Sequence, residues 1–584
     1  KGYMNMENLE TGQERSTNVW PDLPAGSGAE VMKYRFNWNY PVVFSTHDPK
    51  KLYAGSNHLH VTTNGGQSWE VISPDLTRND PETIKSSGGP ITQDNTGAEY
   101  YANIFVITES PYTENEIWTG SDDGLVYLTK DGGKTWENVT PPMAPKNNMM
   151  NSIDVNPFVK GGAYVVGTSY KFGDNTPYIY KTEDYGKTWK LITHGIPDEE
   201  FVRVVRADPK RKGLLYAGTE KGMWVSFDDG ASWSAFQLNL PPVPIHDLAV
   251  KEDNLIAATH GRSFWMIDDL TPLHQMSKEI EAKKSYLFKP MPSYRMAGGS
   301  GWGRRDARLE GENHPGGVMM HYYVATGGNE EVSIDIMEMD GDIIQTFSNK
   351  SKERATQLKV KKGGNRFVWN MRYPGYKTFP GLVFYSSPNI GPKAVPGKYK
   401  ARLTANGQVT EQEFEIVKDP RVPTTQQEFQ EQFDFLSKVR DKVSEAHQGI
   451  LDIRKIKTDL GYVKTKVEEK PENKGLLDAM KKFQDDLTVI ENDIHQTKNQ
   501  AQQDPLNFGI KLNNRLAFLL YEEGTGDYPP TRQAEQVRQE LSRQIDDELN
   551  KLNALIDSRV PAINEMIKGK GIEMIMIKKG PTDM

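Results

Sequence analysis

Short apolar runs bounded by polar turn residues recur through the first half of the chain. Leu52–Gly55 reads LYAG, Ile117–Gly120 reads IWTG and Leu215–Gly218 again reads LYAG. Each run is followed by a second short apolar run that leads into a turn. Runs of this length between turn residues are typical of strands in small antiparallel sheets. The pattern therefore predicts a series of strand meanders.

An eight-residue turn motif follows the third strand of most of these meanders. It has the form Ser/Thr-x-Asp-x-Gly-x-Thr/Ser-Trp and occurs four times, with Asn64, Asp131, Asp184 and Asp228 at the acidic position and Trp69, Trp136, Trp189 and Trp233 at the end. An Asp or Asn next to Gly suits a tight turn, because its side chain bonds to nearby backbone N–H groups. The Trp begins the next strand with a large apolar surface. We therefore predict that these residues are structural and not catalytic.

The uneven spacing of the motif indicates one repeated unit with loop insertions. A repeat of about 40–50 residues made of short strands is typical of propeller blades. We predict five blades within residues 1–270, as part of a larger propeller. The fifth unit, Ile245 to Asp269, has lost the turn motif. Residues 1–13 read as an outer strand, either of a blade whose other strands lie upstream or of the fifth blade, which would close the ring.

The second half of the chain changes character twice. Residues 271–284 read as a linker, and residues 285–420 contain short strands at regular spacing, which predicts an immunoglobulin- or fibronectin-like β-sandwich with a loop at Ala297–Gly303. Residues 421–584 predict a helical bundle, with Thr531 as the cap of its last helix. The residues expected to face inward from that helix are Val537, Leu541, Ile545, Leu549, Leu552 and Ile556. The predicted fold class is mainly β, with a propeller, a sandwich and a C-terminal α-helical bundle.

Composition excludes several classes of function. The chain has 584 residues, a net charge of −8 and no cysteine. The acidic balance and the absence of a basic patch disfavour nucleic acid. Disulfides, thiolate metal sites and a cysteine nucleophile are excluded, and no apolar run is long enough for a membrane span. Because the chain begins with Lys1 and shows no signal peptide, we expect a processed product or a fragment.

The motif and several longer phrases carry a resemblance to a known family. The motif is the Asp box, or BNR repeat, of sialidases, xyloglucanases and sortilin-type receptors. The phrases GGPITQDNTGAEYY, VSFDDGASW and ATHGRSFWMIDDLTPL resemble the large bacterial sortilin-like BNR-repeat proteins that are often labelled glycosyl hydrolases, and the resemblance covers essentially the whole chain. It implies an exported protein in the periplasm, at the outer membrane or on the cell surface of a bacterium. It also implies further blades upstream, so we expect missing N-terminal blades or another subunit as a partner.

Candidate chemistry lies in loops on the face opposite the turn motifs, which we call the upper face. We expect the polar segment Thr77–Glu99 to cover this face. Glycoside hydrolysis needs two carboxylates, about 5–10 Å apart. The carboxylates that could supply such a pair are Asp94, Glu99, Asp122, Asp123, Asp174 and Glu220. The alternative is that they are solvated loop acids.

Other side chains in these loops suit ligand binding more than catalysis. The candidates are Tyr100, Tyr170, Lys171, His260 and Arg262, and the nearby aromatics Tyr101, Phe172 and Tyr178 suit stacking on a sugar or peptide or simple lid packing. Arg203 and Arg206 are predicted on a strand, which disfavours a sialidase-type arginine cluster. His60, His246 and His260 are expected to form hydrogen bonds, and neither a metal nor a cofactor is predicted.

Two functions remain open from the sequence. The first is an exported sortilin-like propeller scaffold that binds a protein, peptide or glycan through its upper-face loops. The second is a glycoside hydrolase that acts on a polysaccharide with a carboxylate pair in the propeller cleft.

Overall fold

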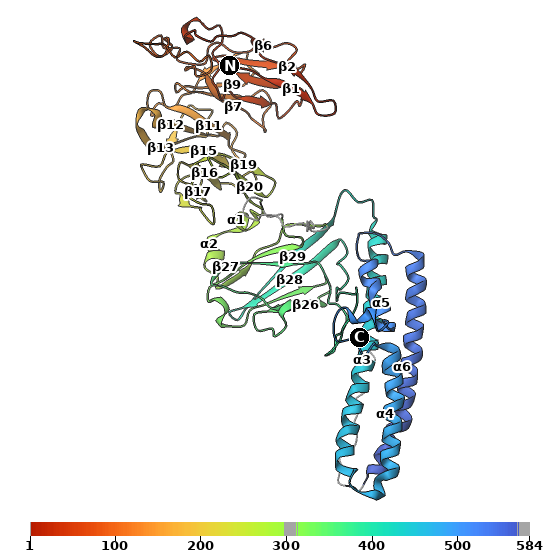
Figure 1. Cartoon of the computed structure of the whole chain (residues 1–584). Coiled ribbons are helices and arrows are strands. Elements are labelled where there is room, and N and C mark those ends of the chain that lie inside the picture. Colours follow the sequence, from red (N-terminus) through yellow and green to blue (C-terminus); the bar gives the residue numbers. More distant parts are fainter. Residues whose placement is uncertain (1, 297–310, 312–313, 569, 571–584) are drawn as a thin grey trace. The chain divides into compact units, whose positions relative to one another are not determined.

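The computed structural model describes residues 2–296, 311, 314–568 and 570, and the predicted loop Ala297–Gly303 lies outside them. The chain divides into two compact units, Lys1–His274 and Gln275–Met584 (Figure 1). The division falls within the predicted linker, where the structure has the short helices α1 (Thr271–Gln275) and α2 (Lys278–Glu281).

The first unit is a series of small antiparallel meanders, which we call blades 1 to 5. Four of them have four strands and the fifth has three, so the unit is β-propeller-like. The strands of blades 1 and 2 are β3 (Val42–Phe44), β4 (Leu52–Gly55), β5 (Leu59–Thr62), β6 (Glu70–Val71), β7 (Ile104–Glu109), β8 (Ile117–Ser121), β9 (Val126–Thr129) and β10 (Glu137–Asn138). Those of blades 3 to 5 are β11 (Met149–Val155), β12 (Ala163–Ser169), β13 (Asp174–Thr182), β14 (Lys190–Leu191), β15 (Val202–Ala207), β16 (Leu215–Thr219), β17 (Met223–Ser226), β18 (Ser234–Ala235), β19 (Ile245–Lys251), β20 (Asn254–Thr259) and β21 (Phe264–Ile267).

Each blade packs its apolar face on the next blade in sequence. Separate buried cores lie between blades 1 and 2, 2 and 3, 3 and 4, and 4 and 5. The repeated glycine of the second strand permits this packing. A Cβ added at Gly120 would lie 2.6 Å from the Cβ of Met150, and one at Gly218 would lie 2.6 Å from Cγ2 of Ile245. The glycine is therefore required because the inner strand of the following blade passes directly over it.

The four turn motifs share one hydrogen-bond pattern, and we call them the aspartate turns. In the second of them, Thr129 Oγ1 donates to Asp131 Oδ1 at 2.8 Å, while the amide and hydroxyl of Thr135 donate to the carboxylate at 2.9 and 2.7 Å. The bonds from Thr135 lower the pKa of Asp131 to about 2. These backbone and hydroxyl donors hold the carboxylate within the turn, as a structural role requires.

The tryptophan of each aspartate turn is tied to a backbone carbonyl. Trp136, Trp189 and Trp233 donate from Nε1 to the carbonyls of Ile72, Val139 and Ile192. Each of these acceptors directly follows the outer strand of the preceding blade. The turn therefore anchors one blade to the edge of the blade before it.

The N-terminal residues form a hairpin, β1 (Asn5–Asn8) and β2 (Gln13–Ser16), that lies on blade 1 and not on blade 5. Arg15 donates to the carbonyl of Gly65 at 2.6 Å, and Trp69 Nε1 donates to the carbonyl of Thr17. The blade 5 sheet contains only β19, β20 and β21. The alternative in which residues 1–13 complete the fifth blade is therefore wrong.

The first and fifth blades expose apolar faces. The exposed side chains, with their exposed fractions, are Val42 (41%) and Phe44 (64%) on blade 1 and Phe264 (77%) and Met266 (55%) on blade 5. Among the described residues the five blades do not close into a ring, since closure would cover these two faces.

The second unit begins with two sheets around one buried core. Their orders are β22–β24–β27 and β23–β29–β28–β25–β26. The strands are β22 (Ser285–Leu287), β23 (Ser293–Arg295), β24 (Val318–Val324), β25 (Ser333–Met337), β26 (Ile343–Ser348), β27 (Gly363–Trp369), β28 (Gly397–Ala405) and β29 (Gln408–Lys418). The immunoglobulin- or fibronectin-like assignment stays a prediction.

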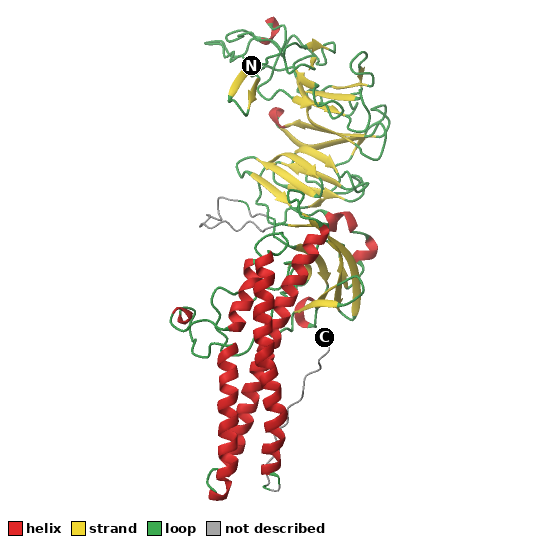
Figure 2. Cartoon of the chain, turned by 90° about the vertical axis from the view of Figure 1, so that its right-hand side faces the viewer, coloured by secondary structure: helices red, strands yellow, loops and turns green. Residues whose placement is uncertain are grey.

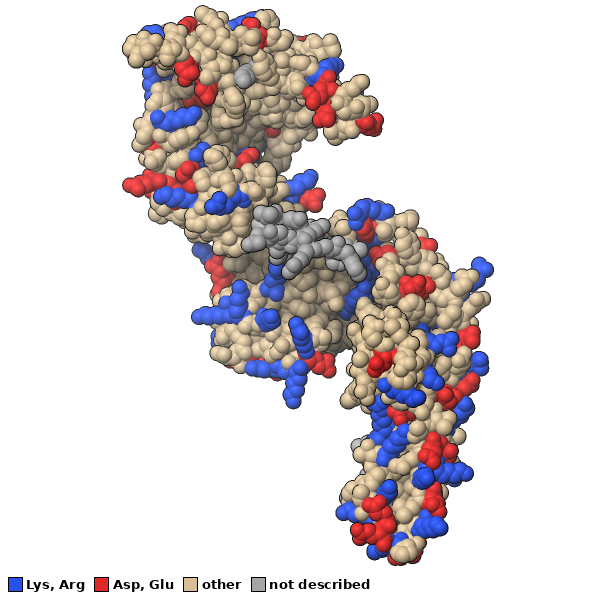
Figure 3. Space-filling model, in the orientation of Figure 1, with Lys and Arg blue, Asp and Glu red and all other residues tan. Residues whose placement is uncertain are grey.

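The helical region contains α3 (Gln426–Val467), α4 (Lys474–Ile494), α5 (Leu512–Glu522) and α6 (Arg532–Ile567), which run side by side (Figure 2). Thr531 caps α6 as predicted, because its hydroxyl accepts from the Ala534 amide. Val537 was expected inside but is 43% exposed, since Ala534 and Leu541 already face the core at that end of the helix. Cations and anions are interspersed over the helical surface (Figure 3). None of the helices described is both long and apolar enough to cross a bilayer.

Candidate functional site on the upper face

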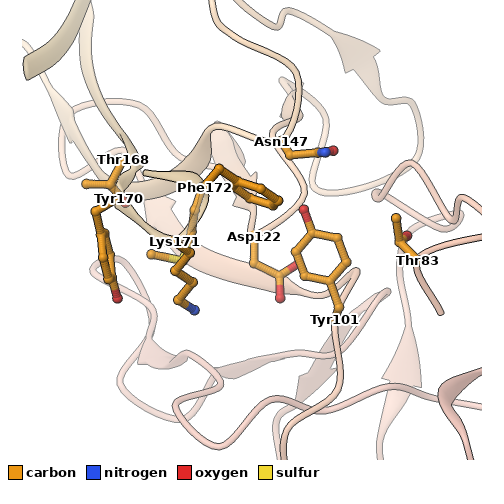
Figure 4. A pocket seen from close by; sticks show the side chains of 9 residues that line it. Thr83, Tyr101, Asp122, Asn147, Thr168, Tyr170, Lys171 and Phe172 are labelled. Carbon is orange, nitrogen blue, oxygen red and sulfur yellow. The ribbon is translucent and has the colours of Figure 1, made fainter. Parts of the chain in front are cut away.

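A cavity of about 370 Å³ opens on the upper face between blades 2 and 3 (Figure 4). Its walls come from the β6–β7 connection, the β8–β9 turn, the β10–β11 connection and the β12–β13 turn. The lining residues are Thr83, Tyr101, Asp122, Asn147, Met149, Thr168, Tyr170, Lys171 and Phe172. Asp122, Tyr170 and Lys171 were candidates from the sequence, and the structure brings all three together.

Asp122 is the carboxylate of this cavity and is only 4% exposed. The backbone amide of Asn103 donates to Asp122 Oδ1 at 2.7 Å, and Asn103 Nδ2 donates to Oδ2 at 3.3 Å. Burial raises the pKa of Asp122 to about 7, and the charge of Asp123 adds to the effect while Asn103 and Lys171 oppose it. In Figure 4 this carboxyl lies between the side chain of Lys171 and the ring of Tyr101. Asp122 therefore exchanges a proton near neutral pH.

Asp123 does not join Asp122 in the cavity. Its carboxylate accepts from the Ser121 hydroxyl at 2.6 Å and from the Arg78 amide at 2.8 Å. The guanidinium of Arg78 donates to the Asp123 carbonyl at 2.8 Å. Asp123 therefore holds the start of the segment Thr77–Glu99 on the β8–β9 turn, which places Thr83 in the cavity wall.

Tyr101 directs a buried polar atom into the cavity (Figure 4). Its hydroxyl oxygen is inaccessible to solvent and has no hydrogen-bond partner among the described residues. Burial raises the pKa of Tyr101, and the charges of Asp122 and Asp123 raise it further, so the hydroxyl keeps its proton. A buried hydroxyl without a partner costs free energy.

The wall of the cavity that blade 3 contributes is a single turn of 3₁₀ helix, η2 (Tyr170–Phe172). It ends at Gly173, whose φ of 78° lies in the left-handed region that favours glycine. The Phe172 ring is 62% exposed and faces the cavity. Tyr170 stacks on Phe201 with ring centroids 4.9 Å apart, and the Arg203 guanidinium lies 5.3 Å above the Tyr170 ring.

Arg203 links Tyr170 to other predicted residues. It donates to the single oxygen Oε2 of Glu220 from Nε at 2.9 Å and from Nη2 at 2.7 Å, which is a charge-assisted ion pair. Its charge also helps to lower the pKa of His246, whose main cause is burial, and the His246 ring lies against His260 at 4.8 Å. Glu220 is therefore linked to Tyr170 through Arg203, His260 contacts His246, and neither Glu220 nor His260 lines the cavity.

The remaining predicted acids lie outside the cavity. Asp94 and Glu99 are exposed in the β6–β7 connection. Asp174 accepts from the Tyr178 hydroxyl at 2.7 Å and from the Thr176 amide. Of the six candidates only Asp122 lines this cavity, so the cavity does not contain the predicted carboxylate pair among the described residues.

Two predicted ligand-binding residues also have other positions. The Tyr100 hydroxyl donates to the carbonyls of Pro24 and Ser27, so this side chain holds the N-terminal segment. Arg262 is exposed and donates to the carbonyl of Gly261.

Among the other residues considered from the sequence, His60 and Arg206 make structural contacts. His60 is 1% exposed and bonds through Nε2 to the Ser56 hydroxyl at 2.8 Å, and burial lowers its pKa to about 3. Arg206 pairs with Asp247 at 2.7 Å. Within the described part of the chain, no three acidic or histidine side chains are grouped as metal ligands would be.

Four residues that line the cavity were not indicated by the sequence. They are Thr83, Asn147, Met149 and Thr168. Their positions depend on how two neighbouring blades meet. The one available signal was the segment Thr77–Glu99, which contains Thr83.

Comparisons with known proteins give short matches. No family model matches the chain. Vacuolar protein sorting/targeting protein 10 of Laccaria bicolor is 34% identical over 110 residues, which are 18% of this chain and 7% of that protein. An oligoxyloglucan-reducing end-specific xyloglucanase of Emericella nidulans is 25% identical over 105 residues, which are 18% of this chain and 13% of that protein. The chain therefore matches less than a seventh of the length of either relative.

Solved structures with partial similarity include a GH74 xyloglucanase from Xanthomonas campestris and YCF48 bound to a D1 peptide. The first is 12% identical, covers 68% of this chain and 54% of its own, and has a TM-score of 0.32. The second is 18% identical, covers 48% and 77%, and has a TM-score of 0.29. At these scores the description of the first unit as β-propeller-like rests on its own sheets.

Proposed function

We propose that the first unit binds a glycan in the upper-face cavity of blades 2 and 3. The observation that carries the proposal is the combination of exposed aromatic surface with a buried hydroxyl that lacks a partner and a buried carboxyl. Phe172 offers a ring face, while the Tyr101 hydroxyl and the Asp122 carboxyl offer a donor and a proton-exchanging group. Sugars present apolar C–H faces and hydroxyl groups together, so such a mixed cavity suits them.

The choice of a glycan also rests on the names of curated relatives. Two of them are oligoxyloglucan-reducing end-specific xyloglucanases, or are described as probable ones. Another is a protein sorting/targeting protein, which favours a peptide or protein ligand instead. The volume of about 370 Å³ lies at the lower end of the about 300–1,000 Å³ typical of small-molecule sites.

Hydrolysis is the second candidate function. The raised pKa of Asp122 suits a general acid near neutral pH. The usual mechanism needs a second carboxylate across the scissile bond. No second acidic side chain lines the cavity among the described residues, so binding is the better supported function.

The test is calorimetric binding of a panel of xyloglucan and other β-glucan oligosaccharides to the full chain. Tyr101→Phe should weaken binding about tenfold, which corresponds to one lost hydrogen bond of about 1.4 kcal/mol. Phe172→Ala should weaken it at least as much, because a stacking surface is removed.

Matched controls lie at the other end of the blades. Tyr112→Phe and Phe158→Ala make the same changes at exposed sites in the β7–β8 and β11–β12 turns, and they should leave affinity unchanged. The proposal fails if no oligosaccharide binds or if Tyr101→Phe equals its control. If a peptide binds and Tyr101→Phe and Phe172→Ala weaken that binding, the ligand is a peptide and not a glycan. The appearance of shortened oligosaccharides in the mixture would support hydrolysis.

We also propose that the chain is a sortilin-like BNR-repeat protein that is exported to the surface or periplasm of a bacterium. The four aspartate turns support this proposal, since their shared hydrogen bonds suit Asp boxes. The partner proposed for the first unit is further blade sequence, either from an N-terminal portion or from another subunit. The support is the hairpin β1–β2, which stands against blade 1 as the outer strands of a preceding blade would.

A further inference from the structure

A larger cavity, of about 540 Å³, lies in the second unit between its two sheets and its helices. The ends of β23 and β27, the segment before β28, helix α3 and the α5–α6 turn contribute to its walls. Among the described residues, the charged side chains that line it are Arg295, Arg372, Lys393, Asp419, Arg421 and Asp527. This cavity is separate from the upper-face site, which belongs to the first unit.

Arg295 is fully engaged in holding the unit together. Its guanidinium is 2% exposed and donates to Asp527 Oδ1 at 3.1 Å, to the Ala394 carbonyl at 2.9 Å and to Gln432 Oε1 at 2.9 Å. It also lies 4.7 Å from the centre of the Phe429 ring. The contact with Asp527 therefore compensates Arg295, and Asp527 is one carboxylate among three neighbouring cations, Arg295, Arg372 and Lys393.

Arg421 and Asp419 neutralise each other. Arg421 donates from Nε to both carboxylate oxygens of Asp419, at 2.9 and 3.2 Å, and from Nη2 at 2.6 Å. A bidentate pair of this kind is self-contained. It adds no net charge to the cavity.

Arg372 and Lys393 have no carboxylate partner of their own among the described residues. They are partners in an isolated antiparallel β-bridge, which places them side by side. Arg372 Nη1 donates to the Gly391 carbonyl at 2.9 Å, and Lys393 Nζ donates to the Met296 carbonyl at 3.0 Å. Within residues 2–296, 311, 314–568 and 570, neither forms an ion pair with a carboxylate.

The pKa values of Lys393 and Arg372 are both lowered in this cavity. Burial lowers the pKa of Lys393 to about 8 against the attraction of Asp527, and the charges of Arg295 and Arg372 lower it further. Burial also lowers the pKa of Arg372, with Arg295 adding to the effect and Asp527 opposing it. Two adjacent cations in a partly desolvated cavity are costly unless an anion offsets them.

We propose that this cavity binds a small molecule through an oxyanion group, a carboxylate, sulfate or phosphate, held between Arg372 and Lys393. The planar guanidinium matches the two oxygens of such a group, and the ammonium supplies a compact charge beside it. The volume suits a ligand of the size of a sugar acid.

The test uses the full chain and four probes at constant ionic strength, which are glucuronate, citrate, sulfate and inorganic phosphate. Calorimetry should show binding of at least one of them. The probe that binds with the highest affinity identifies the class of oxyanion. Arg372→Gln and Lys393→Gln should each weaken that binding at least tenfold. Lys398→Gln is the matched control, because Lys398 is exposed on β28 outside the cavity, and it should leave the affinity unchanged.

The pH dependence separates a direct role of Lys393 from a structural one. The charged groups that face it are Arg295, Arg372 and Asp527, and the Arg421–Asp419 pair is neutral as a unit. Because the Lys393 amine must be protonated to hold an anion, the affinity for the anion should fall about tenfold from pH 7 to pH 9. Lys393→Arg should keep the affinity and lose the pH dependence. Failure of all four probes to bind the wild-type chain, or equal binding by Lys393→Gln and Lys398→Gln, would overturn the proposal.

Discussion

Asp122 is a buried carboxyl whose ionisation should be measurable in the stability of the protein. Burial raises its pKa to about 7, well above the value of about 3.9 in an unfolded chain. The folded state therefore prefers the protonated form. The contribution of this group to stability is fully present below about pH 4 and is lost as the pH rises through about 7.

We predict that Asp122→Asn removes this pH dependence. Between pH 5 and pH 7 the free energy of unfolding of the wild-type chain should fall relative to that of the variant by about 1 kcal/mol per pH unit. Urea unfolding at several pH values, followed by tryptophan fluorescence, measures the difference. Parallel stability curves for the two proteins over this range would show that Asp122 stays ionised.

The sequence predicted a cavity residue only where a polar or aromatic side chain stands in a short turn that follows a recognisable strand. Asp122, Tyr170 and Lys171 stand in short turns after recognisable strands, so the sequence indicated them. Tyr100 stands next to Tyr101 in the sequence, yet it turns toward Pro24 and Ser27. Which of two adjacent aromatics faces a cavity depends on packing against a distant segment, and one sequence does not contain that information.

At the scale of elements, local rules predicted the strands and turns well. The aspartate turns are fixed by hydrogen bonds within eight residues, so their sequence alone specifies them. Helix α5 was not predicted, although Leu512, Leu516, Leu519 and Leu520 have helical spacing, because a helix of eleven residues is marginal by itself and depends on packing against α3 and α6. The exposure of Val537 has a similar origin, since burial along a helix depends on where its neighbours end.

The aspartate turns lead to a prediction about the fourth of them. Asp228 accepts from Ser226, from the Ser232 amide and from the Ser232 hydroxyl. Asp228→Ala should lower stability by about 1 kcal/mol through lost hydrogen bonds at an exposed turn. Affinity for ligands at the upper face should be unchanged, because this turn lies at the opposite end of the blade.

Asp228→Asn is the control that the chain itself supplies. Asn64 occupies the same position in the first turn, where it accepts from the Ser68 amide at 3.0 Å and donates to the Ser68 hydroxyl at 2.9 Å. The amide should therefore retain most of the stability, as thermal unfolding would show. If Asp228→Ala stays fully stable yet loses ligand binding, the structural role assigned to the turn is wrong.

At the scale of the whole molecule, the N-terminal hairpin repeats a relation found between every pair of successive blades up to the fourth. The carbonyl of Thr17 accepts from Trp69 as the carbonyl of Ile72 accepts from Trp136. A Cβ at Gly66 would meet Thr17 at 2.6 Å, and a Cβ at Gly133 would meet the Ile72 carbonyl at the same distance. Thr17 also follows β2 directly, as Ile72 follows β6. The hairpin thus has the position of the outer half of a preceding blade, without its inner strands.

The exposed faces beside this hairpin and on blade 5 should therefore make the 584-residue chain self-associate when it is prepared alone. Uncovered apolar sheet faces favour non-native contacts. Sedimentation velocity should show concentration-dependent association that Phe44→Lys and Phe264→Lys each reduce, while Tyr521→Lys, at an exposed aromatic on α5, does not. A protein that supplies the proposed additional blades should suppress the association when it is added. A monodisperse monomer at all concentrations would contradict the idea that these faces require a cover, since apolar surfaces of this kind would then be stable in water without a partner.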